Sequence, residues 1–278
     1  MSGHKTYFTR PQCQGALVRA ALLVVLLGGV AGCVTETTHS VYSKEVTRDN
    51  AVESHVSAAM QYLREGDHDN ALRHLKSAYE LDSRSATVHN GLALAFQMGG
   101  ENELAEKHYK AALRGDRQLT AARNNYAVFL YGEGRFDEAC GQLHKVVDDT
   151  LYAGRPEAFV NLGKCELRRG HVDDAEEALE RALALNRNSA PALIELVGIK
   201  LDKGDYVDAH KYYQNFQMTK SRQSSRSLFL GIQLADYFGD EDELASYVLA
   251  LKNLYPHSEE YVRYRKEFSN DTAHRTTR

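Results

Sequence analysis

The residues of this 278-residue chain that could do chemistry are its histidines, its cysteines and its paired acids. The 12 His are scattered, and none forms the HExxH pattern that binds catalytic zinc. The chain has no Walker sequence and no GxSxG elbow, and its Gly-Glu-Gly at 132–134 lacks the third glycine of a dinucleotide-binding loop. The Asp-Asp pairs at 148–149 and 173–174 are typical of loops and helix caps. We therefore predict no enzyme activity, no catalytic residue, no cofactor and no metal site.

Cys33 ends an N-terminal segment with the features of an export signal. Residues 1–19 carry three basic residues and no acid, and residues 20–32 are apolar and end in small residues. This apolar run is shorter than the ~20 residues that a membrane-spanning helix needs, although a single-pass anchor is the alternative. The junction at 30–33, Val-Ala-Gly-Cys, resembles a bacterial lipobox, which implies acylation of Cys33 and cleavage before it. Thr35, where an inner-membrane lipoprotein has Asp, implies export to the outer membrane, with the protein facing the periplasm.

Cleavage at this point makes the chain more acidic. The whole sequence carries 34 Lys+Arg against 38 Asp+Glu, a net charge of −4. Removal of residues 1–32 leaves 31 basic residues against the same 38 acids, a net charge of −7. Such a chain has no electrostatic attraction to nucleic acid, so we expect no nucleic-acid partner.

A period of 34 to 36 residues organises the rest of the chain. Alanine recurs at this interval, and a glycine stands five residues before each of the first five alanines and six before the last. The alanines are Ala71, Ala105, Ala139, Ala175, Ala209 and Ala245. Glycine ends a helix in the left-handed conformation, and a small alanine lets the next helix cross it closely. The spacing predicts six helix–turn–helix units, at 52–85, 86–119, 120–153, 156–189, 190–223 and 226–259.

These units resemble the tetratricopeptide repeat family, which implies an all-α solenoid that forms a right-handed superhelix. The residue four places after each alanine is expected on the buried face: Leu75, Tyr109, Leu143, Leu179, Tyr213 and Leu249. The usual tryptophan of the repeat is replaced in all six units, and packing explains the two histidines among the replacements better than chemistry does. These replacements are His55, His89, Arg123, Phe159, Leu193 and Phe229. Residues 33–51 are predicted to be the lipidated cysteine and a flexible tether, and residues 260–278 a capping helix and a disordered tail.

Two cysteines remain in the mature chain, Cys140 and Cys165. Their separation of 25 residues matches no zinc-binding spacing. They fall on neighbouring helices of units three and four, where they could form a disulfide or remain as two buried thiols. An oxidising compartment favours the disulfide.

A partner-binding groove is expected on the first helix of each unit. In the repeat family, positions 2, 5, 9, 12 and 13 of the unit face this groove. Here those positions include Val56, Met60, Leu63, Arg64, Asn90, Leu94, Gln97, Met98, Asn124, Val128, Tyr131, Val160, Lys164, Leu167 and Arg168. The apolar members suit a helical or extended peptide, and Lys164 with Arg168 could clamp a phosphoryl or carboxylate group. The alternative is that several of these residues only pack against neighbouring helices.

A closer resemblance covers nearly the whole mature chain. It is carried by the lipobox, the six repeats and the cysteine pair, together with the runs at 121–131 (AARNNYAVFLY), 134–140 (GRFDEAC) and 161–165 (NLGKC). These resemble the type IV pilus biogenesis/stability lipoproteins of the PilF/PilW family, the pilotins of the pilus secretin. The resemblance implies an outer-membrane lipoprotein that binds secretin subunits and promotes their assembly, with the cysteine pair as a disulfide. We expect the protein itself to be a monomer. The alternative is a repeat lipoprotein that scaffolds peptidoglycan enzymes or another secretion system.

Overall fold

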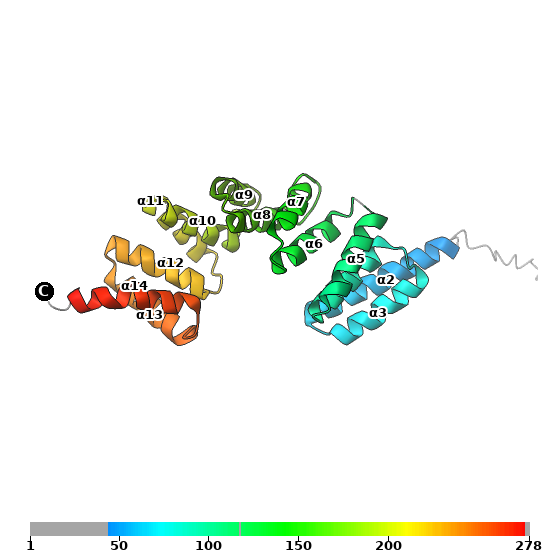
Figure 1. Ribbon diagram of the computed structural model, residues 1–278, viewed down its shortest axis with the longest axis horizontal. Coiled ribbons are helices and arrows are strands. Elements are labelled where there is room, and N and C mark those ends of the chain that lie inside the picture. Colours follow the sequence, from blue (N-terminus) through cyan, green and yellow to red (C-terminus); the bar gives the residue numbers. More distant parts are fainter. Residues whose placement is uncertain (1–43, 117, 276–278) are drawn as a thin grey trace, which may run out of the picture. The chain divides into compact units, whose positions relative to one another are not determined.

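The computed structural model describes residues 44–116 and 118–275 (Figure 1). The predicted signal sequence, the lipobox and residues 34–43 of the predicted tether lie outside the described residues. Residues Arg48–Arg278 form one compact unit. In the described residues every element is an α-helix, and none of these helices has the length and apolarity to cross a bilayer.

The helices follow one another as six pairs and a final helix. The pairs are α2 (Lys44–Glu65) with α3 (His68–Leu81), α4 (Ala86–Met98) with α5 (Asn102–Gly115), α6 (Thr120–Gly132) with α7 (Phe136–Val147), α8 (Arg155–Arg169) with α9 (Val172–Leu185), α10 (Ala190–Asp202) with α11 (Tyr206–Met218), and α12 (Ser225–Phe238) with α13 (Glu241–Leu254). The last helix is α14 (Glu259–Arg275). The six pairs match the six predicted repeat units, and the all-α repeat architecture is as predicted.

The turn inside each pair has the expected backbone. The glycine of every turn has a φ of 73–81°, the left-handed region in which other residues are strained. In three pairs an aspartate then caps the second helix. Asp67, Asp205 and Asp240 accept hydrogen bonds from the backbone N–H three residues later.

The buried face of the second helices follows the predicted alanine register in five units. The repeat alanines of units one to five, from Ala71 to Ala209, are fully buried, and so is the residue four places after each of them. The prediction for unit six was wrong, because Leu249 is 58% exposed. The glycine–alanine interval is six residues in this unit, so Leu244, five residues after Gly239, holds the repeat position. Helix α13 consequently buries Tyr247 and Leu251 instead.

The ends of the helical array differ from the prediction. Helix α2 begins at Lys44, so residues 44–51, predicted to be flexible tether, are helical. Helix α14 contains the predicted capping segment 261–268 and continues to Arg275, into the predicted tail. Neither extension contains Gly or Pro, and adding residues to a helix already held by packing costs little. The capping helix packs on α12, where the Arg263 guanidinium lies 4.7 Å from the centre of the Phe229 ring.

Histidine pairs occupy the tryptophan position of units one and two. His55 faces His74 with 3.2 Å between their Nδ1 atoms, and His89 faces His108 at 2.9 Å. Each pair joins the first helix of a unit to its second, so the predicted packing role is confirmed. Burial lowers the pKa of His89 and lowers that of His108 to about 4. At neutral pH the His89–His108 pair is therefore uncharged.

Candidate partner-binding groove

The first helices of successive units contact one another. Helix α4 contacts α6, α6 contacts α8, α8 contacts α10, and α10 contacts α12. The predicted groove residues lie on this series of helices, from α2 to α8. Arg64, Met98, Val128 and Arg168 are exposed, and Met98 and Val128 are large apolar side chains with exposed fractions of 51% and 42%. The half-buried members are Val56, Met60, Asn90, Leu94, Gln97, Asn124, Tyr131, Lys164 and Leu167.

Two of the predicted groove residues are core residues instead. Leu63 is only 8% exposed and packs in the cluster around Leu75, between α2 and α3. Val160 is 6% exposed and packs in the cluster around Leu179, between α8 and α9. A fixed position in the repeat does not decide burial, because the neighbouring helix determines which side of the position is covered.

Units three and four form a small cleft that contains three of the predicted residues. Val128 and Tyr131 of α6 line it together with Lys164 of α8. Ala127, Leu143 and Asn161 complete the lining, and the volume is about 50 Å³. The cleft thus offers an apolar wall with one amine and one amide at its edge. This arrangement suits an apolar side chain whose flanking main chain can accept hydrogen bonds.

Asparagines recur along the same helices. Asn90 of α4, Asn125 of α6 and Asn161 of α8 stand 35 and 36 residues apart. The Asn125 amide donates to Asn90 Oδ1 at 3.1 Å. The neighbouring Asn124 has a buried Oδ1 without a hydrogen-bond partner in the described residues. A side-chain amide can donate and accept at once, as the main chain of an extended peptide requires.

The asparagine series was only partly predicted from the sequence. Asn90 and Asn124 are among the predicted groove residues, whereas Asn125 and Asn161 are not. The available signal was the recurrence of an asparagine at intervals of 35 and 36 residues through three consecutive units.

The proposed clamp of Lys164 and Arg168 is not assembled. Lys164 lines the cleft, whereas the Arg168 guanidinium lies 5.2 Å from the centre of the Phe136 ring, at a different hollow. Phe136 also contacts Tyr131 edge to face, with 5.2 Å between ring centres. Arg168 thus packs beside one wall of the cleft but does not share an anion site with Lys164.

A disulfide joins the two units that form the cleft. Cys140 of α7 and Cys165 of α8 are bonded, with their Cα atoms 5.7 Å apart, and both are fully buried. The predicted disulfide is confirmed, and the alternative of two free thiols is wrong for this structure. The bond ties α7, which supplies Leu143, to α8, which supplies Asn161 and Lys164.

Known proteins share this repeat arrangement. Residues 56–120 and 130–198 match family models described as tetratricopeptide repeat. Over 250 residues the chain is 38% identical to the type IV pilus assembly protein PilF of Pseudomonas aeruginosa (strain PAO1), an alignment that covers 90% of this chain and 99% of PilF. The chain belongs to the PilF family.

Solved structures agree with the assignment of this PilF-family chain. A structure of Pseudomonas aeruginosa PilF is similar with a TM-score of 0.76 and 38% identity, over 80% of this chain and 99% of that one. PilW, described as a widely conserved type IV pilus biogenesis factor, is similar with a TM-score of 0.67 and 27% identity, over 76% of this chain and 97% of that one. The PilF-family chain is therefore a tetratricopeptide-repeat protein of type IV pilus biogenesis.

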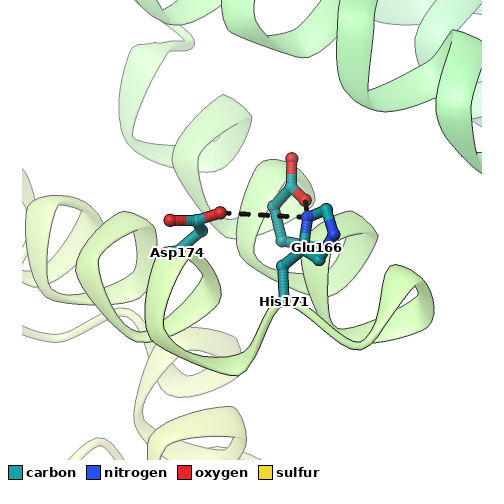
Figure 2. A group of neighbouring side chains, drawn as sticks. All are labelled: Glu166, His171 and Asp174. Atoms are coloured by element: carbon teal, nitrogen blue, oxygen red, sulfur yellow. Dashed lines mark hydrogen bonds and ion pairs between the residues drawn. The ribbon is translucent and has the colours of Figure 1, made fainter.

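A buried glutamate of α8 lies at the centre of a polar cluster in this PilF-family chain (Figure 2). Glu166 of α8 accepts a hydrogen bond from His171 Nδ1 at 2.9 Å, and Arg169 Nη1 donates to each of its two oxygens, at 3.0 and 3.2 Å. His144 Nε2 of α7 lies 3.1 Å from its other oxygen. Sequence reasoning missed Glu166, which holds the position of Phe96 in unit two. It links α7, α8 and the start of α9.

The same cluster has atoms that could bind a metal ion, but its carboxylate is already paired with a positive charge. Ligand atoms of Glu166, His171 and Asp174 lie within 4.8 Å of one another. However, the Arg169 guanidinium already contacts both oxygens of Glu166. A divalent cation would have to displace this cation, so we assign the cluster a structural role.

A second carboxylate ties units two and three together. Glu106 of α5 accepts hydrogen bonds from Lys110 at 2.8 Å, from Arg135 at 2.7 Å and from the Tyr126 hydroxyl at 3.0 Å. Lys110, followed by Arg135 and Tyr126, lowers the pKa of Glu106 from 4.5 to about 2. The carboxylate is thus ionised in the folded protein far below the pH at which it would protonate in the unfolded chain.

The Glu106→Gln variant is expected to be less stable at neutral pH. Glu106 is 23% exposed, and solvent screening reduces the full effect of its pKa shift to about 1–2 kcal/mol of unfolding free energy at pH 7. Because its folded pKa is lowered, this contribution is present above pH 4.5 and is lost as the pH falls toward 2. Urea unfolding of the wild type and of Glu106→Gln measures the difference between their unfolding free energies. At pH 3 this difference should be less than half of its value at pH 7. Glu180→Gln, at an exposed glutamate of α9, is the control, and an equal loss in both variants would contradict the prediction.

Proposed function

We propose that this protein is an outer-membrane lipoprotein that binds subunits of the type IV pilus secretin and promotes their assembly into multimers. The observation that carries the proposal is the cleft of units three and four, which residues of α6, α7 and α8 line, together with the Asn125–Asn90 hydrogen bond that continues the asparagine series onto α4. Membership of the PilF family supports a role in pilus assembly.

The groove suits an extended or helical segment of the partner. Asn90, Asn125 and Asn161 would bind polar groups of the segment, and the cleft at Val128 and Tyr131 would take an apolar side chain. Such a segment loses conformational freedom on binding, so the rigid disulfide between units three and four helps by holding the cleft in one shape.

The membrane anchor supplies the second part of the mechanism. Two or three acyl chains on Cys33 would hold the protein at the membrane stably. Secretin subunits bound to anchored copies would then be concentrated in two dimensions at the membrane. A higher effective concentration favours multimer assembly without any new contact.

The Cys33→Ala variant tests this proposal in cells. We expect a folded, exported protein that is lost from the outer-membrane fraction, with secretin that is mislocalised and no longer runs as a multimer on unheated gels. Thermal unfolding of the purified variant checks that the repeats are unchanged. Secretin multimers at the wild-type level in the Cys33→Ala strain would contradict the anchoring step.

A pull-down with the mature chain tests the partner. Recovery of the secretin is the expected result. Recovery of a peptidoglycan enzyme without the secretin would overturn the proposed partner and leave the repeat fold unaffected.

A further inference from the structure

A second hollow lies in units one and two, away from the groove. It is lined by α3, α4 and α5 and has a volume of about 640 Å³. At about 100° per residue, Phe96 of this lining lies on the side of α4 opposite the groove residue Leu94. We call it the basic hollow; its lining is Leu72, Lys76, Tyr79, His89, Leu92, Phe96, Lys107, His108, Ala111 and Arg114.

The basic hollow combines an apolar floor with cations that have no partner. Lys76, Lys107 and Arg114 are exposed at its edge, and none of them makes an ion pair or hydrogen bond with the described residues. No acidic residue belongs to the lining. The His89–His108 pair, whose members are joined Nδ1 to Nδ1, forms a neutral wall. An apolar floor with three free positive charges suits a ligand that is both anionic and apolar.

The repeat itself does not require this charge pattern. Units three and four have a hollow at the equivalent place, where eight of the ten positions recur. There Lys107 is replaced by Glu177 and Arg114 by Ala184, and the lining also contains Asp148 and Asp174. The fold thus produces the hollow in both places, whereas only the first is purely cationic.

We infer that the basic hollow binds the headgroup of an anionic phospholipid. The inference rests on the proposed anchoring at Cys33. Only residues 34–43 separate that cysteine from α2, and such a segment spans at most about 35–40 Å. Units one and two are therefore the repeats that the anchor would keep nearest to the bilayer, where phosphates and the upper acyl chains offer this combination of charge and apolar surface.

Headgroup binding would give the protein a second membrane contact. An acyl anchor alone leaves the repeats free to rotate about the tether. Cations near an anionic membrane each strengthen binding about fivefold. Contact through the basic hollow would orient units one and two at the membrane while leaving the groove on the other side of α4 available to its partner.

The test uses the mature chain with Cys33→Ser, so that no acyl chain contributes to binding. A negative result then contradicts lipid binding by the basic hollow and says nothing against the proposed anchoring at Cys33. Co-sedimentation is measured with phosphatidylcholine vesicles that contain or lack phosphatidylglycerol. We expect binding only with phosphatidylglycerol, and Lys107→Glu, which installs the charge of Glu177, should weaken it at least fivefold. Lys266→Glu on α14, with the same change of net charge at an exposed site, should weaken it less than twofold.

A fluorescent reporter locates the contact. The chain has no Trp, so Tyr79→Trp places a single one at the edge of the basic hollow, and Phe238→Trp places one in unit six. Only the emission of Tyr79→Trp should shift to the blue with phosphatidylglycerol vesicles. Equal losses for Lys107→Glu and Lys266→Glu would overturn the inference. So would full competition by inorganic phosphate, or binding of an acidic peptide in the absence of vesicle binding.

Discussion

Replacing both Cys140 and Cys165 with alanine is expected to lower the unfolding free energy by about 3 kcal/mol. The disulfide closes a loop with a sequence separation of 25 residues, and a cross-link of this length restricts the unfolded chain by about that amount. Both sulfur atoms are in fully buried residues, so the double variant also loses some packing. Urea unfolding of the mature chain under oxidising conditions measures the difference.

Reduced wild-type protein separates the two causes. It keeps both sulfur atoms and loses only the cross-link, so it should retain the packing and lose most of the stabilisation. Equal stability of the oxidised and reduced wild type would contradict the prediction. In cells, loss of the disulfide should lower the amount of the protein, because 3 kcal/mol is a large part of a domain's total stability of about 5–15 kcal/mol.

For the proposed complex with the secretin, the Val128→Arg variant is expected to bind at least tenfold more weakly than the wild type. Val128 is 42% exposed and lines the cleft beside Lys164. A guanidinium at this position fills the apolar part of the cleft and brings a second positive charge toward the Lys164 amine. An interface residue at the centre of a pocket commonly contributes more than the ~1.4 kcal/mol that corresponds to tenfold in affinity.

The matched control is Val262→Arg on α14. Val262 is 61% exposed and lies outside the groove helices, so the same substitution should leave secretin binding unchanged. Both variants should unfold within about 0.5 kcal/mol of the wild type, since substitutions of exposed residues rarely matter more. Titration of the purified secretin with each mature chain provides the affinities. Unchanged binding of Val128→Arg would exclude the cleft from the interface.

The repeat fold was predictable because its signals are local. The turn at Gly66 has a positive φ, which favours glycine, and the fully buried position of Ala71 has room only for a small residue. Both residue types therefore recur in the sequence at a fixed interval. The error at Leu249 shows the limit of this approach. The interval changed by one residue in unit six, and one residue on a helix turns the side chain by about 100°.

The cleft of units three and four was predictable in outline only. Its apolar residues Val128 and Tyr131 follow from the repeat positions, whereas Leu63 and Val160, predicted by the same positions, are covered by neighbouring helices. Asn161 became part of the cleft because α8 is packed against α6 and α7. The order of these residues along the chain does not show how α8 packs against α6 and α7.

The sequence by itself determined the six units and their turns, because each depends on residues that are close along the chain or on a repeated interval. Only the tertiary structure decided which charges meet. Glu166 gathers partners from α7, from α8 and from the turn before α9, and the basic hollow collects Lys76 and Lys107 from different units. Electrostatic interactions act through space over a few ångströms, so their sites form only when packing brings distant parts of the chain together.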